Sequence, residues 1–86
     1  MTRYAFSLRQ EVLLEKGASI LADLFRYEQE KNLTGQNHPV QVMYELVWTA
    51  KRNILLTTSE KDLDRIEGQF DFAKEFLSRI EADDNV

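Results

Sequence analysis

The chain has 86 residues, a formal net charge of −4 at neutral pH and no cysteine. A chain of this length forms one domain with a modest core, and the absence of cysteine excludes a disulfide framework and thiolate metal sites. No continuous apolar segment has the length of a membrane span or the character of a signal peptide, so we expect a soluble, cytoplasmic protein.

Charge is distributed unevenly along the chain. Residues 1–58 hold six acidic and seven basic residues, whereas residues 59–86 hold nine acidic and four basic ones. The acidic C-terminal part repels nucleic acid and anionic lipid, and it favours a basic or mixed protein surface as partner. Solubility alone is the simpler explanation of the same charge.

Residues 1–6 are predicted to form a loose N-terminal arm, which is followed by a helix over residues 8–31. Ser7 and Gln10 have the spacing of a capping box at the start of this helix. Its wide apolar face is typical of a helix flanked by two neighbours. Two stripes form that face: Leu14, Ala18, Leu21 and Phe25, and beside them Leu13, Gly17, Ile20, Leu24 and Tyr27. The small pair Gly17 and Ala18 would let another helix approach closely, and a merely tolerated glycine is the alternative.

A second helix is predicted over residues 39–56. Pro39 suits its first turn, where the missing N–H costs nothing, and Asn37 or His38 would be the N-cap. The apolar stripe consists of Val40, Met43, Val47, Ala50 and Ile54, widened by Leu46 and Leu55. The many β-branched residues would also suit a strand, but the length, the spacing and the initial proline favour a helix.

The third helix, predicted over residues 59–81, has the cleanest pattern in the chain. Six apolar residues follow one another at intervals of three and four: Leu63, Ile66, Phe70, Ala73, Leu77 and Ile80. Ser59 is the expected N-cap, and acidic residues in the first turn favour the positive end of the helix dipole. Residues 82–86 are predicted to be a frayed acidic tail.

These elements predict an all-α, three-helix bundle in which short connections make consecutive helices antiparallel neighbours. Residues 1–86 are expected to form a single domain. Large apolar side chains remain outside the stripes, so we also predict that the bundle dimerises, most simply as a two-fold homodimer.

No pattern in the sequence indicates an enzyme, a cofactor or a metal site. His38 is the only histidine, and a metal site or an activated nucleophile requires more partners than one imidazole. Glu67, Asp71 and Glu75 lie four residues apart on one helix face, as carboxylates that bind cations or transfer protons would. Basic residues alternate with them, which favours a solvated charged face.

Nucleic-acid binding is a weaker alternative. Arg3, Arg9, Lys51 and Arg52 could contact phosphates, and the polar joint at residues 56–59 could belong to a helix-turn-helix. The helix that would enter the groove begins with acidic residues, however, and this charge argues against DNA as a ligand.

Aromatic residues outside the apolar stripes are the strongest sign of a binding surface. Phe72 lies off the stripe of the third helix, and Trp48 lies off the stripe of the second. Aromatic and arginine side chains are enriched at the energetic centres of protein interfaces. The candidate interface residues are Tyr44, Trp48, Arg65, Gly68, Phe72 and Phe76. Partial exposure beside a three-helix core is the alternative explanation.

The segment Leu63-Asp64-Arg65-Ile66-Glu67-Gly68-Gln69 resembles the start of a terminal helix in small helical proteins encoded by bacteriophages. This resemblance implies a phage or mobile-element origin. We therefore expect a non-enzymatic adaptor, regulator or inhibitor that binds a protein through the aromatic face of its second and third helices. A structural subunit of a larger assembly, such as a small virion protein, is the alternative.

Overall fold

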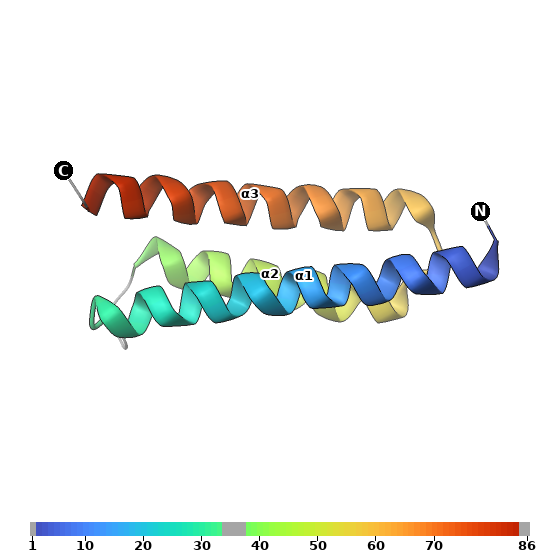
Figure 1. Cartoon of the computed structure of the whole chain (residues 1–86), viewed down its shortest axis with the longest axis horizontal. Coiled ribbons are helices and arrows are strands. Elements are labelled where there is room, and N and C mark those ends of the chain that lie inside the picture. Colours follow the sequence, from blue (N-terminus) through green and yellow to red (C-terminus); the bar gives the residue numbers. More distant parts are fainter. Residues whose placement is uncertain (1, 34–37, 85–86) are drawn as a thin grey trace.

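The computed structural model describes residues 2–33 and 38–84, which form three α-helices. Helix α1 spans Arg3–Glu30, α2 spans Pro39–Leu56 and α3 spans Glu60–Asp84. The helices run alternately in opposite directions and each packs against the other two, in an elongated bundle of 46 × 24 × 16 Å (Figure 1). The described ranges contain no strand. The predicted all-α, three-helix architecture is confirmed.

One stripe from each helix forms the core. Its buried side chains are Leu13, Ile20, Leu24 and Tyr27 from α1, Val40, Val47, Ala50 and Ile54 from α2, and Leu63, Ile66, Phe70, Ala73 and Leu77 from α3. The stripes predicted for α2 and α3 are thus buried, except that Met43, Leu46 and Ile80 are half-buried and Leu55 is exposed. Of the two stripes predicted for α1, only the one with Leu13 is buried. The other stripe leaves Phe25 on the surface.

The prediction of a loose arm is wrong for residues 3–6, because α1 begins directly after Thr2, and Met1 lies outside the described residues. The Thr2 hydroxyl is the N-cap and accepts a hydrogen bond from the N–H of Ala5 at 3.1 Å. Phe6 lies seven residues before Leu13, on the same helix face, and packs against the core. This contact explains why the helix extends into the predicted arm.

Gln10 does not belong to a capping box, since it lies more than one turn inside α1. Its side-chain amide instead donates a hydrogen bond to the carbonyl oxygen of Ile54 at 2.8 Å. The last carbonyls of a helix lack partners within that helix, so Gln10 satisfies the end of α2 from α1. The sequence spacing of Ser7 and Gln10 was therefore a misleading start signal.

The end of α1 is a Schellman motif with Asn32 in the left-handed conformation, at φ 56°. The N–H of Leu33 donates to the carbonyl oxygen of Glu28 at 2.9 Å, and the N–H of Asn32 donates to that of Gln29 at 3.2 Å. Asparagine is one of the few residues besides glycine that adopt this conformation readily. The helix consequently ends one residue before the predicted boundary.

His38 is the N-cap of α2, which confirms one of the two predicted alternatives. The other alternative, Asn37, lies outside the described residues. Nδ1 of His38 accepts a hydrogen bond from the N–H of Val40 at 3.0 Å. Its ring lies 6.3 Å from the buried ring of Tyr27, measured between centroids. Pro39 is the first helical residue, as predicted. The single histidine therefore has a structural role.

The joint between α2 and α3 is organised by Thr57. Its hydroxyl accepts a hydrogen bond from the N–H of Ser59 at 3.1 Å and donates one to the carboxylate of Asp62 at 2.7 Å. Ser59 directly precedes α3, at the predicted N-cap position. At the other end, α3 continues to residue 84, so the prediction of a frayed tail is wrong for residues 82–84, which continue the helix by less than one turn beyond its predicted end.

At Gly17, α1 lies close to side chains of both α2 and α3. A Cβ atom at this position would lie 2.8 Å from Cζ of Phe70 on α3 and 3.5 Å from Cβ of Lys51 on α2. Phe70 is fully buried, so its ring has little room to move. The close approach predicted for the small pair is confirmed at Gly17, whereas Ala18 is exposed. Gly68, by contrast, has no atom within 4 Å of the corresponding position.

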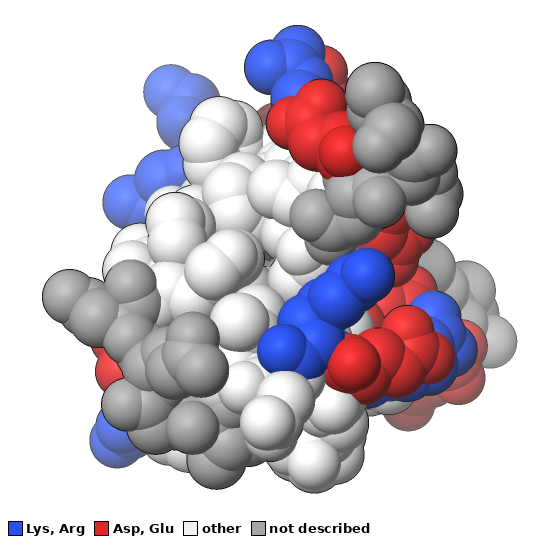
Figure 2. Space-filling model, turned by 90° about the vertical axis from the view of Figure 1, so that its left-hand side faces the viewer, with Lys and Arg blue, Asp and Glu red and all other residues white. Residues whose placement is uncertain are grey.

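Figure 2 looks along the bundle from the end at which α1 ends, α2 begins and α3 ends. Uncharged side chains occupy the middle of this face, and charged ones lie mainly around its periphery. The charged residues thus lie around the bundle axis, as expected when three helices turn their apolar stripes toward one another.

The two glycines provide a matched test of the packing. We expect Gly17→Ala to lower the free energy of unfolding by about 1–3 kcal/mol, because overpacking against Phe70 exceeds the gain in helix propensity. Gly68→Ala should raise it by about 0.5–1 kcal/mol, because only the propensity changes. Urea denaturation followed by circular dichroism measures both. A Gly17→Ala variant as stable as the wild type would show that Phe70 can move aside.

Candidate partner-binding surface

The aromatic residues predicted to form an interface lie on the surface to different extents. Trp48 is 51% exposed and Phe72 is 57% exposed. Tyr44 and Phe76 are half-buried, and Tyr44 packs against the core. About half of the Trp48 and Phe72 side chains is therefore free to contact a partner, and a smaller part of Tyr44 and Phe76 is.

These aromatic residues line two separate cavities. Tyr44 and Trp48 on α2 line a surface cavity of 350 Å³, and Phe72 and Phe76 on α3 line another of 190 Å³. The described linings of the two cavities share no residue. The expected single aromatic face of α2 and α3 is therefore divided into an α2 region and an α3 region.

Phe25 of α1 joins the α2 region, which the sequence did not indicate. It lines a second cavity of 350 Å³ together with Glu28, Gln41, Tyr44 and Glu45, and it is 53% exposed. Sequence periodicity assigned Phe25 to the apolar stripe of α1 that was expected to pack inside. Only the position of α2 relative to α1 leaves its ring at the surface.

A further exposed apolar stripe runs along the outer face of α1. Tyr4, Leu8 and Val12 are 78%, 49% and 56% exposed, and their spacing of four residues places them on one helix face. This stripe was not predicted, because residues 1–6 were expected to form a loose arm. At the end of α2, Leu55 and Leu56 are also exposed, although Leu55 was expected to widen the core stripe.

The remaining two candidates, Arg65 and Gly68, lie on the exposed side of α3. Arg65 lies 3.4 Å from the carboxylate of Asp62, one turn earlier on the same helix. In the α3 cavity, Arg79 forms an ion pair of 2.7 Å with Glu75. The charges of the α3 region are thus paired within the helix, and such exposed pairs contribute little to stability.

An ion-pair network joins α1 to α3. The Arg9 guanidinium lies 2.5 Å from Asp64 and 3.4 Å from Glu67, and Lys16 Nζ lies 2.6 Å from Asp71 and 3.7 Å from Glu67. The hydrogen bond from Asp71 raises the pKa of Lys16, and that from Asp64 raises the pKa of Arg9. The carboxylates predicted to form a solvated face therefore partly hold the helices together.

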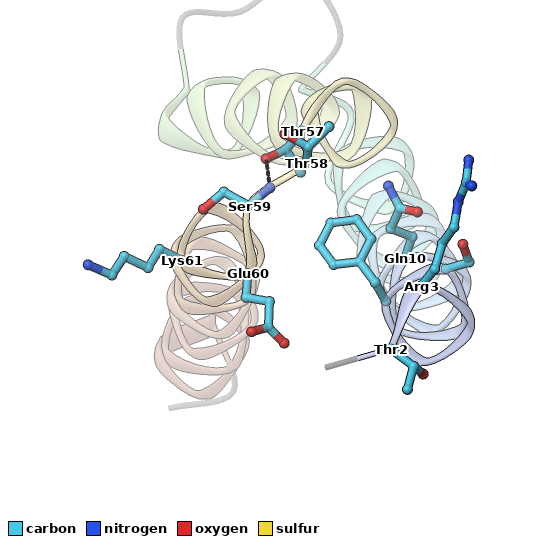
Figure 3. Close-up of a pocket in the computed structure, with 10 residues that line it drawn as sticks. Thr2, Arg3, Gln10, Thr57, Thr58, Ser59, Glu60 and Lys61 are labelled. Carbon is cyan, nitrogen blue, oxygen red and sulfur yellow. Dashed lines mark hydrogen bonds between the residues drawn. The ribbon is translucent and has the colours of Figure 1, made fainter.

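Another cavity, of 880 Å³, lies between the start of α1 and the joint of α2 and α3 (Figure 3). Hydroxyl and charged side chains dominate its lining. In Figure 3, Glu60 points into the space between the helices, while Arg3 and Lys61 point outward on opposite sides. Of its hydroxyls, that of Thr57 already donates to Asp62. This arrangement does not favour an anion and does not assemble a nucleophile with a base.

Within residues 2–33 and 38–84, no three histidine or carboxylate side chains come together in a way that could hold a metal ion. The same part of the chain has no helix that is long and apolar enough to cross a membrane. Exposed apolar side chains are therefore the feature of the described residues that the fold itself does not explain.

Comparison with known proteins supplies a family for this helical chain. The family model of bacterial epsilon antitoxins matches residues 2–80. The chain belongs to this family. No curated protein and no solved structure matches the chain. Membership of an antitoxin family agrees with the prediction of a small protein that acts by binding another protein and not by catalysis.

Two phenylalanines of α3 allow a test of which side chains belong to the core. Phe70 and Phe72 lie two residues apart, and only Phe70 is buried. We expect Phe70→Ala to lower the free energy of unfolding by about 3–5 kcal/mol, because it leaves a cavity in the core. Phe72→Ala should cost less than about 1 kcal/mol, because more than half of the side chain is exposed. Chemical denaturation measures both. Equal large losses would mean that Phe72 belongs to the core.

The raised pKa of Lys16 predicts a pH dependence. Its contribution to stability is complete below the unfolded pKa of about 10.4 and is lost as the pH rises through the higher pKa of the folded state. We expect the wild type to lose up to about 1 kcal/mol more than Lys16→Met between pH 9 and pH 12. The control is Lys74→Met, because Lys74 forms no ion pair within the described residues. A loss in Lys16→Met as large as in the wild type would contradict this assignment.

Proposed function

We propose that this protein neutralises a bacterial toxin protein by direct, non-covalent binding. The family match over residues 2–80 carries this proposal, because it spans all three helices and names an antitoxin. Neutralisation by binding requires an accessible surface and no reacting group. Exposed apolar side chains on all three helices meet that requirement.

The exposed aromatic residues are the proposed anchors of the complex. Burying a fully exposed side chain of this kind contributes about 1.5–3 kcal/mol, and each of these rings can contribute about half of that because it is already about half-buried. Trp48 and Tyr44 would anchor the toxin on α2, and Phe72 and Phe76 are the corresponding residues on α3, with Arg65 and Gly68 beside them. Aromatic anchors in shallow cavities are frequent hot spots.

Fewer acidic side chains of α3 are available to attract a partner than the sequence suggested. Three carboxylates of α3, those of Asp64, Glu67 and Asp71, are engaged by α1. Attraction of a basic toxin surface would then fall to the carboxylates outside this network. Self-association through the same apolar surface stays a prediction, and molar mass measured by light scattering over a tenfold concentration range tests it.

Growth of bacteria that express the toxin of this antitoxin–toxin pair tests the proposal. Co-expression of the wild-type chain should restore growth, and the two purified proteins should elute together. Trp48→Ala should weaken binding by about 2 kcal/mol if the toxin binds the α2 region, and Phe72→Ala should do so if it binds the α3 region. Val42→Ala is the control, because Val42 is apolar and 59% exposed but lies outside both regions. A chain that neither binds the toxin nor restores growth would refute the function.

A further inference from the structure

The α2 region consists of two adjoining surface cavities, each of 350 Å³. Both are lined by Tyr44 and Glu45, so the cavity beside Phe25 lies next to the cavity beside Trp48. We call this surface the Phe25–Trp48 groove, with the described lining residues Phe25, Glu28, Gln41, Tyr44, Glu45, Trp48 and Thr49. Three aromatic side chains line it. A groove of this kind suits the apolar face of a helix.

The groove differs from the α3 cavity in its charge. Glu28 and Glu45 line it, and neither forms an ion pair within the described residues. Elsewhere, the charged residues around the α3 cavity pair with each other, and the carboxylates between α1 and α3 pair with Arg9 and Lys16. The Phe25–Trp48 groove is therefore an aromatic surface with two carboxylates that form no ion pair within the described residues.

The opposite charge lies at the other end of the groove. The guanidinium of Arg52 lies 6.0 Å from the centre of the Trp48 ring, within the range of a cation–π contact. Arg52 follows Glu45 by seven residues, which corresponds to about 10 Å along the helix axis. The groove is thus acidic near Phe25 and Tyr44 and basic beyond Trp48. This order would orient a bound helix as well as select its charge.

We infer that the Phe25–Trp48 groove binds an amphipathic helix of the toxin protein whose apolar face is flanked by lysine or arginine. One large apolar side chain of that helix would lie against Tyr44 and Trp48, and its basic side chains would pair with Glu28 and Glu45. This inference rests on the proposed function, since the helix belongs to the toxin. It goes further by naming one surface and the chemistry of the segment that occupies it.

Trp48 is the only tryptophan of the chain, so its fluorescence reports directly on the groove. The probes are two synthetic amphipathic peptides of 18 residues, one of leucine and lysine and one of leucine and glutamate. The lysine peptide should shift Trp48 emission to shorter wavelength and bind at least about tenfold more tightly than the glutamate peptide. Equal affinities would overturn the inference.

Charge reversal adds a matched control. Glu28→Lys/Glu45→Lys should weaken binding of the lysine peptide about tenfold or more and abolish its preference over the glutamate peptide. Glu15→Lys/Glu81→Lys alters the net charge equally at exposed positions outside the groove and should bind as the wild type does. Equal losses in both variants would reduce the effect to net charge and refute the groove. Circular dichroism verifies that each variant is folded.

Binding to the toxin itself separates this inference from the proposed function. If the wild type and Glu28→Lys/Glu45→Lys bind the toxin equally in calorimetry, the function stands and the groove assignment fails. If the wild type does not bind the toxin, the function itself fails. A blue shift of Trp48 that appears on concentrating the protein alone, with a doubled molar mass, would assign the groove to a second copy and overturn the inference.

Discussion

The contact between Gly17 and the ring of Phe70 sets the geometry of the bundle. Phe70 lies at the middle of the apolar stripe of α3 and is fully buried, and the missing side chain at Gly17 gives its ring the space it occupies. Lys51 of α2 borders the same point. All three helices therefore come close together at Gly17. Because the interior is close-packed, the distance between α1 and α3 depends on this glycine.

That central contact also decides which side chains remain outside. With the Leu13 stripe of α1 turned toward Phe70, the neighbouring stripe faces the flank of α2, where Leu14 and Leu21 are half-buried and Phe25 is exposed. The opposite flank faces α3, where Arg9 and Lys16 meet acidic residues. The two flanks of α1 thus differ in kind: one is closed by ion pairs, and the other forms an open aromatic groove.

Polar residues that resemble functional groups in the sequence serve mainly to terminate helices. His38 caps α2, Thr57 organises the joint before α3, and Gln10 satisfies the end of α2. Once these groups are assigned to the fold, exposed apolar surface and unpaired carboxylates remain. A protein of the antitoxin family needs such a surface and no reacting group, which is the common basis of both proposals.

The sequence by itself determined the three helices and the core, because spacing of apolar residues at three and four is a local property of each segment. The stripe from Leu63 to Leu77 and the start of α2 at Pro39 followed directly from it. Trp48 and Phe72 were also identified as surface residues, because each lies off a complete stripe. The bacteriophage or mobile-element origin implied by residues 63–69 stays a prediction.

Only the tertiary structure decided which flank of α1 is open. Phe25 and Leu13 belong to equally good stripes, and the choice between them depends on where α2 and α3 pack. The same holds for the N-terminal turn, which is helical because Phe6 packs against the core, and for the acidic face of α3, which pairs with α1. Periodicity describes one helix at a time. Which faces meet is decided by all three packing together, and that decision placed Phe25, Tyr44 and Trp48 in one groove.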